Sequence, residues 1–159
     1  MKPAAVEEHR TPSPAAPGPR ETPAGFRPGH PETRSSPLSG ALPEGASTAE
    51  DPGAAIHPDV APRPGGSAVT KKRASAFTGS DLDLVLRGGA LDHLVLTGPA
   101  TSGVVPSTLR RAADLDYRPT VLADGCADAD AEVHRALTEK VFPGRAAVTT
   151  VDAWIADLA

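Results

Sequence analysis

Proline is spread unevenly along this chain of 159 residues, and the imbalance limits how much of it can form a packed domain. Fourteen of the 18 prolines lie in residues 1–66. Beyond the first Met, the same stretch holds only six large apolar residues: Val6, Phe26, Leu38, Leu42, Ile56 and Val60. So little apolar surface cannot offset a backbone ordering cost of about 1–2 kcal/mol per residue. We therefore expect residues 1–66 to be mostly irregular and residues 67–159 to form the folded domain.

The overall composition excludes several classes of function. A net charge of −4 gives no reason to expect nucleic-acid binding. No apolar run approaches the ~18 residues that a membrane span needs, and the polar, proline-broken start does not suggest a secretory signal. The single cysteine, Cys126, excludes an internal disulfide and suits a reducing compartment. We therefore expect a soluble, cytoplasmic protein.

Short apolar segments alternate with helical patterns from residue 67 onward. The expected strands are residues 67–71, 93–97, 119–124 and 146–151. The expected helices are residues 80–89, 104–116 and 129–141, followed by a short final helix. This alternation is typical of βαβ units with a parallel sheet. The sequence therefore predicts an α/β protein.

Residues at the helix ends support this assignment. Ser80 with Asp83 resembles a capping box at the start of the first helix, and Thr149 with Asp152 would cap the final one. Trp154, in the final helix, is expected to be a packing anchor rather than a platform for a ligand. The third helix repeats an apolar residue every four positions, which predicts a core stripe: Val133, Leu137 and Val141.

The segment GPATSGVVPSTLRRAADLDY, residues 98–117, joins an apolar strand to a helix through a tight turn of small residues. Such elbows lie at the carboxyl edge of a parallel sheet, where backbone amides and a helix N-terminus favour anions. Val104 and Val105 lie at the tip, and neither side chain can attack a substrate. The alternative is a plain tight turn without a ligand. The residues expected to bind a substrate or anion are Gly98, Pro99, Ala100, Thr101 and Gly103.

Several phrases taken together resemble the isochorismatase-like hydrolases, also called the cysteine hydrolase family. They are KKRASAF, GSDLDLVLR, LVLTGPATSGVV, STLRRAADLDYRPTVLADGCAD and EVHRALTEKVFP, and the match covers residues 67–158 in register. GFRPGHPE at residues 25–32 and AIHPDVAP at residues 55–62 are similar to the family's connection between its second and third strands. In this interpretation residues 25–66 form that connection. Residues 1–24 match nothing in the family and are expected to be disordered or unrelated.

The resemblance implies a Rossmann-like fold of three α/β/α layers, with a parallel sheet in the strand order 3-2-1-4-5-6. It also implies a site in which an Asp acts as general base, a Lys polarises the site and a Cys attacks the substrate. Lys71 stands at the family's lysine position. The alternative is that it is simply one of the three solvated cations in the phrase KKR. Val104 stands at the cysteine position, so the chain would be a Cys-less member. Some members lack that Cys and protonate an enol ether with the Asp, so hydrolysis is not excluded.

The family's catalytic Asp also has no counterpart in this sequence, and its loss matters more than the loss of the Cys. The family carries it in an apolar strand followed by D-x-Q, whereas Glu7 and Glu8 lie in no strand-like context. We therefore expect strands 1 and 2 of the family fold to be missing, and the N-terminus to be atypical or that of a truncated gene product. Their absence would open a gap of roughly 10 Å beside the strand at residues 93–97. The strand at residues 67–71 would then pair with it directly or sit loosely, leaving an edge open to a partner.

Three further features of the sequence leave alternatives open. The family's cis peptide bond would fall at Pro99–Ala100 and cost about 2.5–4 kcal/mol, whereas a cis Gly98–Pro99 bond costs only about 0.5–1 kcal/mol. A triad of Cys126, His134 and Asp124 is disfavoured by its spacing, and a packing or capping role fits the histidine better. The remaining histidines show no metal-ligand spacing, so neither a metal site nor a cofactor is expected. They include His30 and His57.

The resemblance predicts a domain whose ancestral chemistry is hydrolysis of an amide or enol-ether bond in a small carboxylate-bearing molecule. We expect this activity to be weak or lost in the chain. One alternative is a non-catalytic remnant that binds a small anion or forms a homo-oligomer through the helix at residues 104–116. Arg110 and Arg111 in that helix would then be subunit contacts or simply solvated. The other alternative is a truncated product without a selected function.

Overall fold

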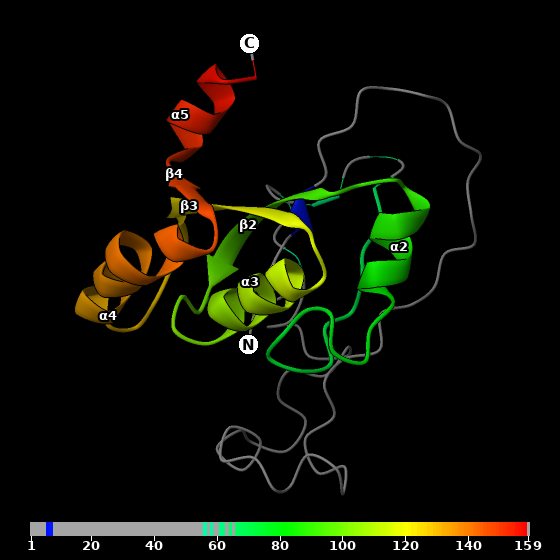
Figure 1. The fold of residues 1–159 in the computed structure, drawn as a ribbon, viewed down its shortest axis with the longest axis horizontal. Coiled ribbons are helices and arrows are strands. Elements are labelled where there is room, and N and C mark those ends of the chain that lie inside the picture. Colours follow the sequence, from blue (N-terminus) through cyan, green and yellow to red (C-terminus); the bar gives the residue numbers. More distant parts are fainter. Residues whose placement is uncertain are drawn as a thin grey trace, which may run out of the picture.

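Strands and helices alternate along the described part of the chain, as the sequence predicts. The computed structural model describes residues 6–7, 56, 58, 61–62, 64 and 66–158. Figure 1 shows these elements, with α3 lying against strands β2 and β3. The α/β class is confirmed. In chain order the elements are β1 (Val6–Glu7), α2 (Leu82–Gly88), β2 (His93–Pro99), α3 (Val104–Asp114), β3 (Arg118–Ala127), α4 (Ala131–Ala136), η3 (Leu137–Val141), η4 (Phe142–Gly144), β4 (Ala147–Thr149) and α5 (Val151–Ala156).

Three parallel strands, in the order β2-β3-β4, form the main part of the sheet. Val95 pairs with Thr120, which pairs in turn with Ala147 on the other side. Because the strands are parallel, their carboxyl ends lie on one edge of the sheet. At that edge Pro99 of β2 pairs with Ala127 of β3. This is the edge at which the sequence places the candidate site.

The short strand β1 is the described partner on the outer side of β2. It runs antiparallel, with Val6 opposite Leu96 and Glu7 opposite Val95. Glu7 therefore lies in a strand, and the expectation that it has no strand-like context is wrong, whereas Glu8 lies outside the described residues. A two-residue antiparallel pairing covers part of an edge that would otherwise present unpaired backbone groups.

Residues 67–71, the expected first strand, form no strand in the structure. Val69 instead packs partly against the apolar core. A little further along, the backbone amide of Ala76 donates to Oγ1 of Thr108 in α3 at 3.0 Å. The prediction of a strand is wrong because a strand needs a partner edge, and a local pattern of apolar residues does not reveal whether one is available.

The main apolar core lies between α3 and one face of the sheet. Alternate strand residues point to the same face, and Leu94, Leu96 and Val121 all belong to the core cluster. Phe142, 1% exposed, belongs to the same cluster. Burying one such side chain stabilises the fold by about 1.5–3 kcal/mol. The matching residues of α3 follow the helical repeat: Val105, Leu109 and Ala112.

Tyr117 joins α2 to the connection between α3 and β3. Its hydroxyl donates to Oδ1 of Asp83 at 2.8 Å, and its ring lies 5.6 Å from that of Phe77. The guanidinium of Arg87 lies 4.5 Å from the centre of the tyrosine ring and donates to the Leu115 carbonyl at 2.6 Å. Cation–π and charge-assisted contacts of this kind each add a modest stabilisation, so together they fasten α2 to the core.

Both predicted helix caps differ from the observed ones. No capping box forms at α2, because Asp83 bonds elsewhere and Ser80 Oγ accepts from the amide two residues further on at 3.3 Å. At α5 the cap is Thr150, whose Oγ1 accepts from the amide three residues further on at 3.3 Å. Thr149, the predicted cap, still belongs to β4 and pairs with β3.

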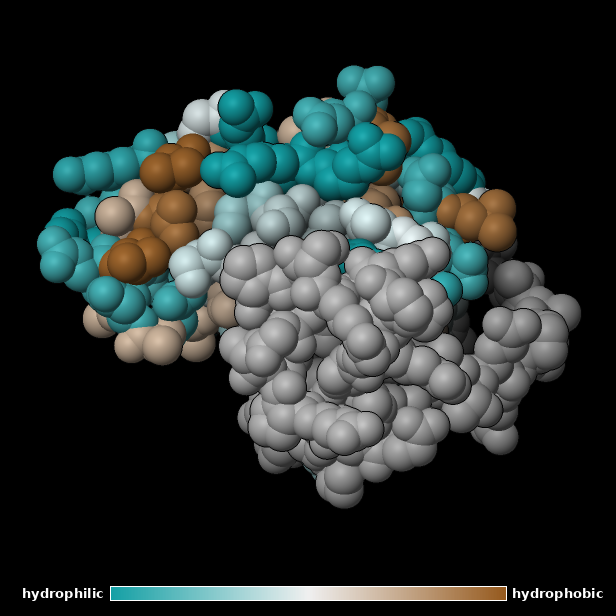
Figure 2. Space-filling view, turned by 90° about the horizontal axis from the view of Figure 1, so that it is seen from below, coloured by the Kyte–Doolittle hydropathy of each residue, from teal (hydrophilic) through white to brown (hydrophobic). Residues whose placement is uncertain are grey.

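The predicted core stripe is wrong at two of its three positions. Val133 is 38% exposed and Val141 is 43% exposed, whereas Leu137 packs against the core. Figure 2 shows apolar side chains at the surface on the side of the molecule where α4 and η3 lie. Val141 turns outward because η3 is a π-helical turn, whose i→i+5 bonds rotate its residues away from the α-helical repeat. Val133 lies before that turn, in α4, where no residue is fully buried. Phe142 takes the core position expected for Val141.

The last helix is peripheral. No residue of α5 is fully buried, and Ile155 is 55% exposed. Trp154, the expected packing anchor, is partly buried and lies outside the main core cluster. Of the helices that the structure describes, none has the length and apolarity needed to span a bilayer.

Candidate functional site

The elbow between β2 and α3 lies at the carboxyl edge of the parallel strands, where the sequence places it. Gly98 has φ +109°, a conformation that residues with a Cβ rarely adopt, so glycine suits this bend. Pro99 ends β2, and α3 begins at Val104 after a four-residue turn. The described residues contain no cis peptide bond, so the bonds on both sides of Pro99 are trans.

Five consecutive backbone amides of the elbow donate to acceptors within the chain. The Thr101 amide donates to the Ala127 carbonyl at 3.0 Å, and the Ser102 amide to Oδ2 of Asp128 at 2.6 Å. The next three amides, of residues 103, 104 and 105, all face the Ala100 carbonyl at 3.1, 3.1 and 3.3 Å. These are the groups that an oxyanion would use. An anion site at residues 98–103 stays a prediction, and its ligand would share or displace these internal acceptors.

Val104 occupies the tip of the elbow and has no exposed surface. It is the first residue of α3, the place at which the resemblance puts a nucleophilic cysteine. Its branched hydrocarbon side chain neither donates a proton nor forms a bond to a substrate. Val105 beside it is 2% exposed and belongs to the apolar core. The two residues therefore close the tip of the elbow with packed hydrocarbon.

Lys71 lies in the irregular segment that precedes α2. Its Nζ donates to the Arg73 carbonyl at 2.8 Å, and burial lowers the pKa of Lys71 below its ordinary value. A lysine with a lowered pKa is typical of functional sites, although desolvation alone produces the same shift. In the region that the structure describes, its ammonium group forms no ion pair. The catalytic role of Lys71 stays a prediction.

Cys126, His134 and Asp124 each have a different partner. The Cys126 thiol donates to the Leu96 carbonyl at 3.8 Å, and the Asp124 carboxylate accepts from the backbone amide of residue 151 at 2.9 Å. Burial raises the pKa of Cys126 to about 11, which keeps the thiol protonated and unreactive at neutral pH. Cys126 lies within β3 rather than in a loop, so the strand is longer than predicted.

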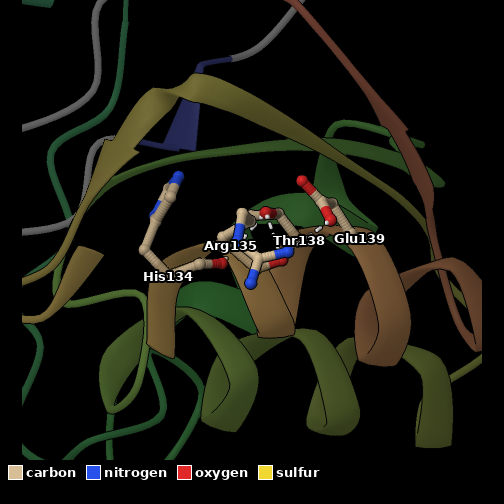
Figure 3. Close-up of polar contacts among 4 residues, drawn as sticks. All are labelled: His134, Arg135, Thr138 and Glu139. Carbon is tan, nitrogen blue, oxygen red and sulfur yellow. Dashed lines mark hydrogen bonds and ion pairs between the residues drawn. The ribbon is translucent and has the colours of Figure 1, made fainter. Parts of the chain in front are cut away.

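His134 and Asp128 contact the elbow, and the sequence alone did not single them out for this. His134 Nδ1 lies 2.8 Å from Oγ1 of the fully buried Thr101. Figure 3 shows the imidazole pointing away from the neighbouring ion pair of Arg135 with Glu139, whose atoms are 3.3 Å apart. The strand order could have indicated these contacts. In a parallel sheet, the residues that follow one strand lie next to the residues that follow its neighbour, so polar residues after β3 lie close to the elbow after β2.

The described residues also form an open hollow of about 680 Å³ at the amino ends of β2, β3 and β4. Its lining includes His93, Arg118 and Arg145. It therefore lies at the edge of the sheet opposite the elbow. Among the described side chains, no three His, Cys, Asp or Glu residues gather in an arrangement that could hold a metal ion.

Comparison with known proteins places this fold and elbow in one family. The isochorismatase domain model matches residues 20–153. The match covers well over half of the chain, so the chain belongs to the isochorismatase family. The resemblance drawn from the sequence phrases is thereby confirmed.

Two curated relatives illustrate the range of the family. The isochorismatase family protein YwoC of Bacillus subtilis is 38% identical over 86 residues, which are 54% of this chain and 46% of that protein. The ureidoacrylate amidohydrolase RutB of Caulobacter vibrioides is 48% identical over 66 residues, which are 42% of this chain and 29% of that enzyme. The matched region therefore spans less than half the length of either relative.

Solved structures show the same fold. An isochorismatase-like hydrolase from Alkaliphilus metalliredigens has a TM-score of 0.65 at 30% identity, covering 79% of this chain and 65% of that one. An isochorismatase family protein from Burkholderia thailandensis has a TM-score of 0.64 at 28% identity, covering 79% and 66% respectively. The Rossmann-like α/β architecture predicted for the domain is thus shared with these proteins.

Proposed function

We propose that this isochorismatase-like domain derives from a hydrolase of amide or enol-ether bonds in small carboxylate-bearing molecules, and that the chain itself hydrolyses them weakly or not at all. The observation that carries the proposal is the fully buried Val104 at the nucleophile position. A covalent route needs a thiolate or hydroxyl there. The elbow amides also support low activity. Free donors aimed at a developing oxyanion supply much of the rate in acyl transfer, whereas these amides already donate to acceptors within the chain.

The amide route is the better-supported ancestral chemistry. The ureidoacrylate amidohydrolase relative matches this chain at 48% identity over 66 residues. Ureidoacrylate combines an amide-type bond with a carboxylate, and an elbow of backbone amides suits an anionic group of that kind. Lys71, at the family's lysine position, would supply the positive charge beside it.

The enol-ether route needs a carboxylic acid that carries a proton near the elbow. Asp128 is the carboxyl group that bonds to the elbow within the described residues. Hydrogen bonds from Ser102, from its side chain and then from its backbone amide, hold the pKa of Asp128 below its ordinary range. Asp128 is therefore ionised at neutral pH and is a poor proton donor, which supports weak or absent activity by this route as well.

Binding of a small anion without catalysis is the second candidate. It is favoured by the 2.6 Å contact between the Ser102 amide and the Asp128 carboxylate, which indicates that the elbow backbone suits a negative partner. Homo-oligomerisation through α3 is a further outcome of the same non-catalytic proposal. Size-exclusion chromatography with light scattering separates a monomer from a dimer.

Hydrolysis assays on the full chain test the proposal. Wild type, Lys71→Ala and the matched control Lys72→Ala, which alters the neighbouring exposed lysine, are each incubated with ureidoacrylate, isochorismate and simple amides. We expect all three proteins to give the rate of the uncatalysed reaction. Turnover by wild type and Lys72→Ala that disappears in Lys71→Ala would establish an active hydrolase and overturn the loss of activity.

A further inference from the structure

The connection between β3 and α4 holds the elbow at two consecutive residues. The backbone amide of Thr101 donates to the Ala127 carbonyl at 3.0 Å, and its Oγ1 lies 2.8 Å from Nδ1 of His134. The Ser102 amide donates to Oδ2 of Asp128 at 2.6 Å. Three bonds therefore join the turn before α3 to a segment about 26 to 33 residues later in the chain.

The Asp128 carboxylate accepts hydrogen bonds both from the elbow and from the start of α4. One carboxylate oxygen receives the Ser102 amide, and the other accepts from the backbone amide of Asp130 at 3.3 Å. Asp130 is the N-cap of α4, and its side chain accepts from the amides of residues 132 and 133 at 2.8 and 3.1 Å. The cap in turn fixes the start of α4, a helix of six residues whose last turn carries His134. The two contacts with the elbow are thus parts of one connected unit.

Within the elbow itself, the amides of residues 103–105 share the Ala100 carbonyl as their acceptor. Gly103, the N-cap of α3, has no side chain with which to cap the helix. Thr101 is fully buried, and a buried hydroxyl that loses its partner costs about 1–3 kcal/mol. The bonds from the β3–α4 connection therefore hold Thr101 and Ser102, the two residues of the turn that the internal bonds to Ala100 leave out.

We propose that Asp128 and His134 are positioning residues that hold the elbow closed and thereby set the accessibility of position 104. The inference concerns the same elbow as the proposed function, and its relevance to chemistry rests on that proposed function. It makes a separate statement about conformation, because a closed elbow is defined by bonds and burial whether or not any substrate is hydrolysed.

Thiol labelling in a Val104→Cys background tests the proposal, because Cys is close to Val in size. The rate of iodoacetamide modification is measured by mass spectrometry at position 104 and at the native Cys126, which serves as an internal reference for opening of the core. Asp128→Ala and His134→Ala should each raise the rate at position 104 by about tenfold, the effect of losing roughly 1.4 kcal/mol of local closure. The rate at Cys126 should not change.

Conservative and control variants separate positioning from general destabilisation. Asp128→Asn and His134→Asn retain a polar atom near the same place and should stay closer to the parent rate than the alanine variants. Glu139→Ala breaks the exposed ion pair with Arg135 on the neighbouring turn (Figure 3) and should leave both thiols at their parent rates. Equal acceleration at positions 104 and 126 in the alanine variants, or no acceleration at either, would overturn the proposal.

Hydrogen exchange provides the same test if the Val104→Cys background does not fold. In the otherwise native chain, Asp128→Ala should speed exchange of the amides of residues 101–105 while the amides of β3 keep their rates. Unchanged exchange at the elbow would contradict the proposal. Since neither readout involves turnover, a failure of the proposed function and a failure of this inference give different results.

Discussion

Helices α3 and α5 each follow a parallel strand of the same sheet, yet they are buried to very different degrees. α3 has 11 residues, of which six are buried, whereas none of the six residues of α5 is buried. α3 follows β2, which has described partners on both sides, while α5 follows β4, a three-residue strand paired with β3. Burial of a helix therefore depends on the area of sheet it can cover as well as on its own apolar pattern. The candidate site begins the better-packed helix.

Truncation of an α3 core residue should have the largest effect on stability. Leu109 is 1% exposed and packs against the sheet, so Leu109→Ala removes buried surface and leaves a cavity. We expect the free energy of unfolding to fall by about 2–5 kcal/mol. Urea unfolding followed by circular dichroism measures the change. A loss below about 1 kcal/mol would break the contrast between the two helices.

Alkaline pH should weaken the region around α3 next. Burial raises the pKa of Cys126 from its ordinary value of 9.0 to about 11, and burial with the Asp83 hydrogen bond raises that of Tyr117 from 10.0 to about 12. A raised pKa means that the folded state favours the protonated form. The resulting stability is complete below about pH 9 and is lost as the pH rises through 11 and then 12.

Variants assign this alkaline loss to the two groups. Urea unfolding is measured at steps between pH 8 and pH 12 for wild type, Cys126→Ala and Tyr117→Phe. Cys126→Ala should remove the earlier part of the decline and Tyr117→Phe the later part. A stability that stays constant over this range in wild type would show that neither group is held in its protonated form by the fold.

The same type of truncation near α5 should have the smallest effect. Leu158 is 45% exposed just after the helix, so Leu158→Ala removes a side chain that is largely in water. We expect a change within about 0.5 kcal/mol. Because the substitution is again Leu to Ala, the difference from Leu109→Ala measures the contrast directly. Equal losses would mean that the end of the chain is packed as tightly as α3.

Local patterns in the sequence were sufficient for the central part of the fold. The apolar strand at residues 93–97, the small-residue turn and the helix after it appear in the structure as β2, the elbow and α3. These elements could be predicted because alternation, turn residues and helical spacing all lie within short stretches of chain. The position of Val104 at the elbow tip followed from the same local order.

Features that depend on distant partners were not predicted. Residues 67–71 have the pattern of a strand, but whether a strand forms depends on an available edge, and β1 pairs with part of the outer edge of β2. The π-helical turn at η3 moved Val141 to the surface and Phe142 into the core, which a fixed repeat of four does not anticipate. The bonds from Asp128 and His134 to the elbow join residues far apart in sequence, so they follow from the parallel pairing of the strands and not from a local motif.

Hydrogen exchange of the elbow amides tests the central claim most directly, namely that the elbow is closed on itself around a buried Val104. The amides of residues 101–105 all donate within the chain, so each should exchange far more slowly than in an unstructured peptide at the same pH. NMR on the native chain gives the five rates. Exchange at the rate of an unstructured peptide would mean that these donors are free to bind a substrate, and would contradict the closed elbow.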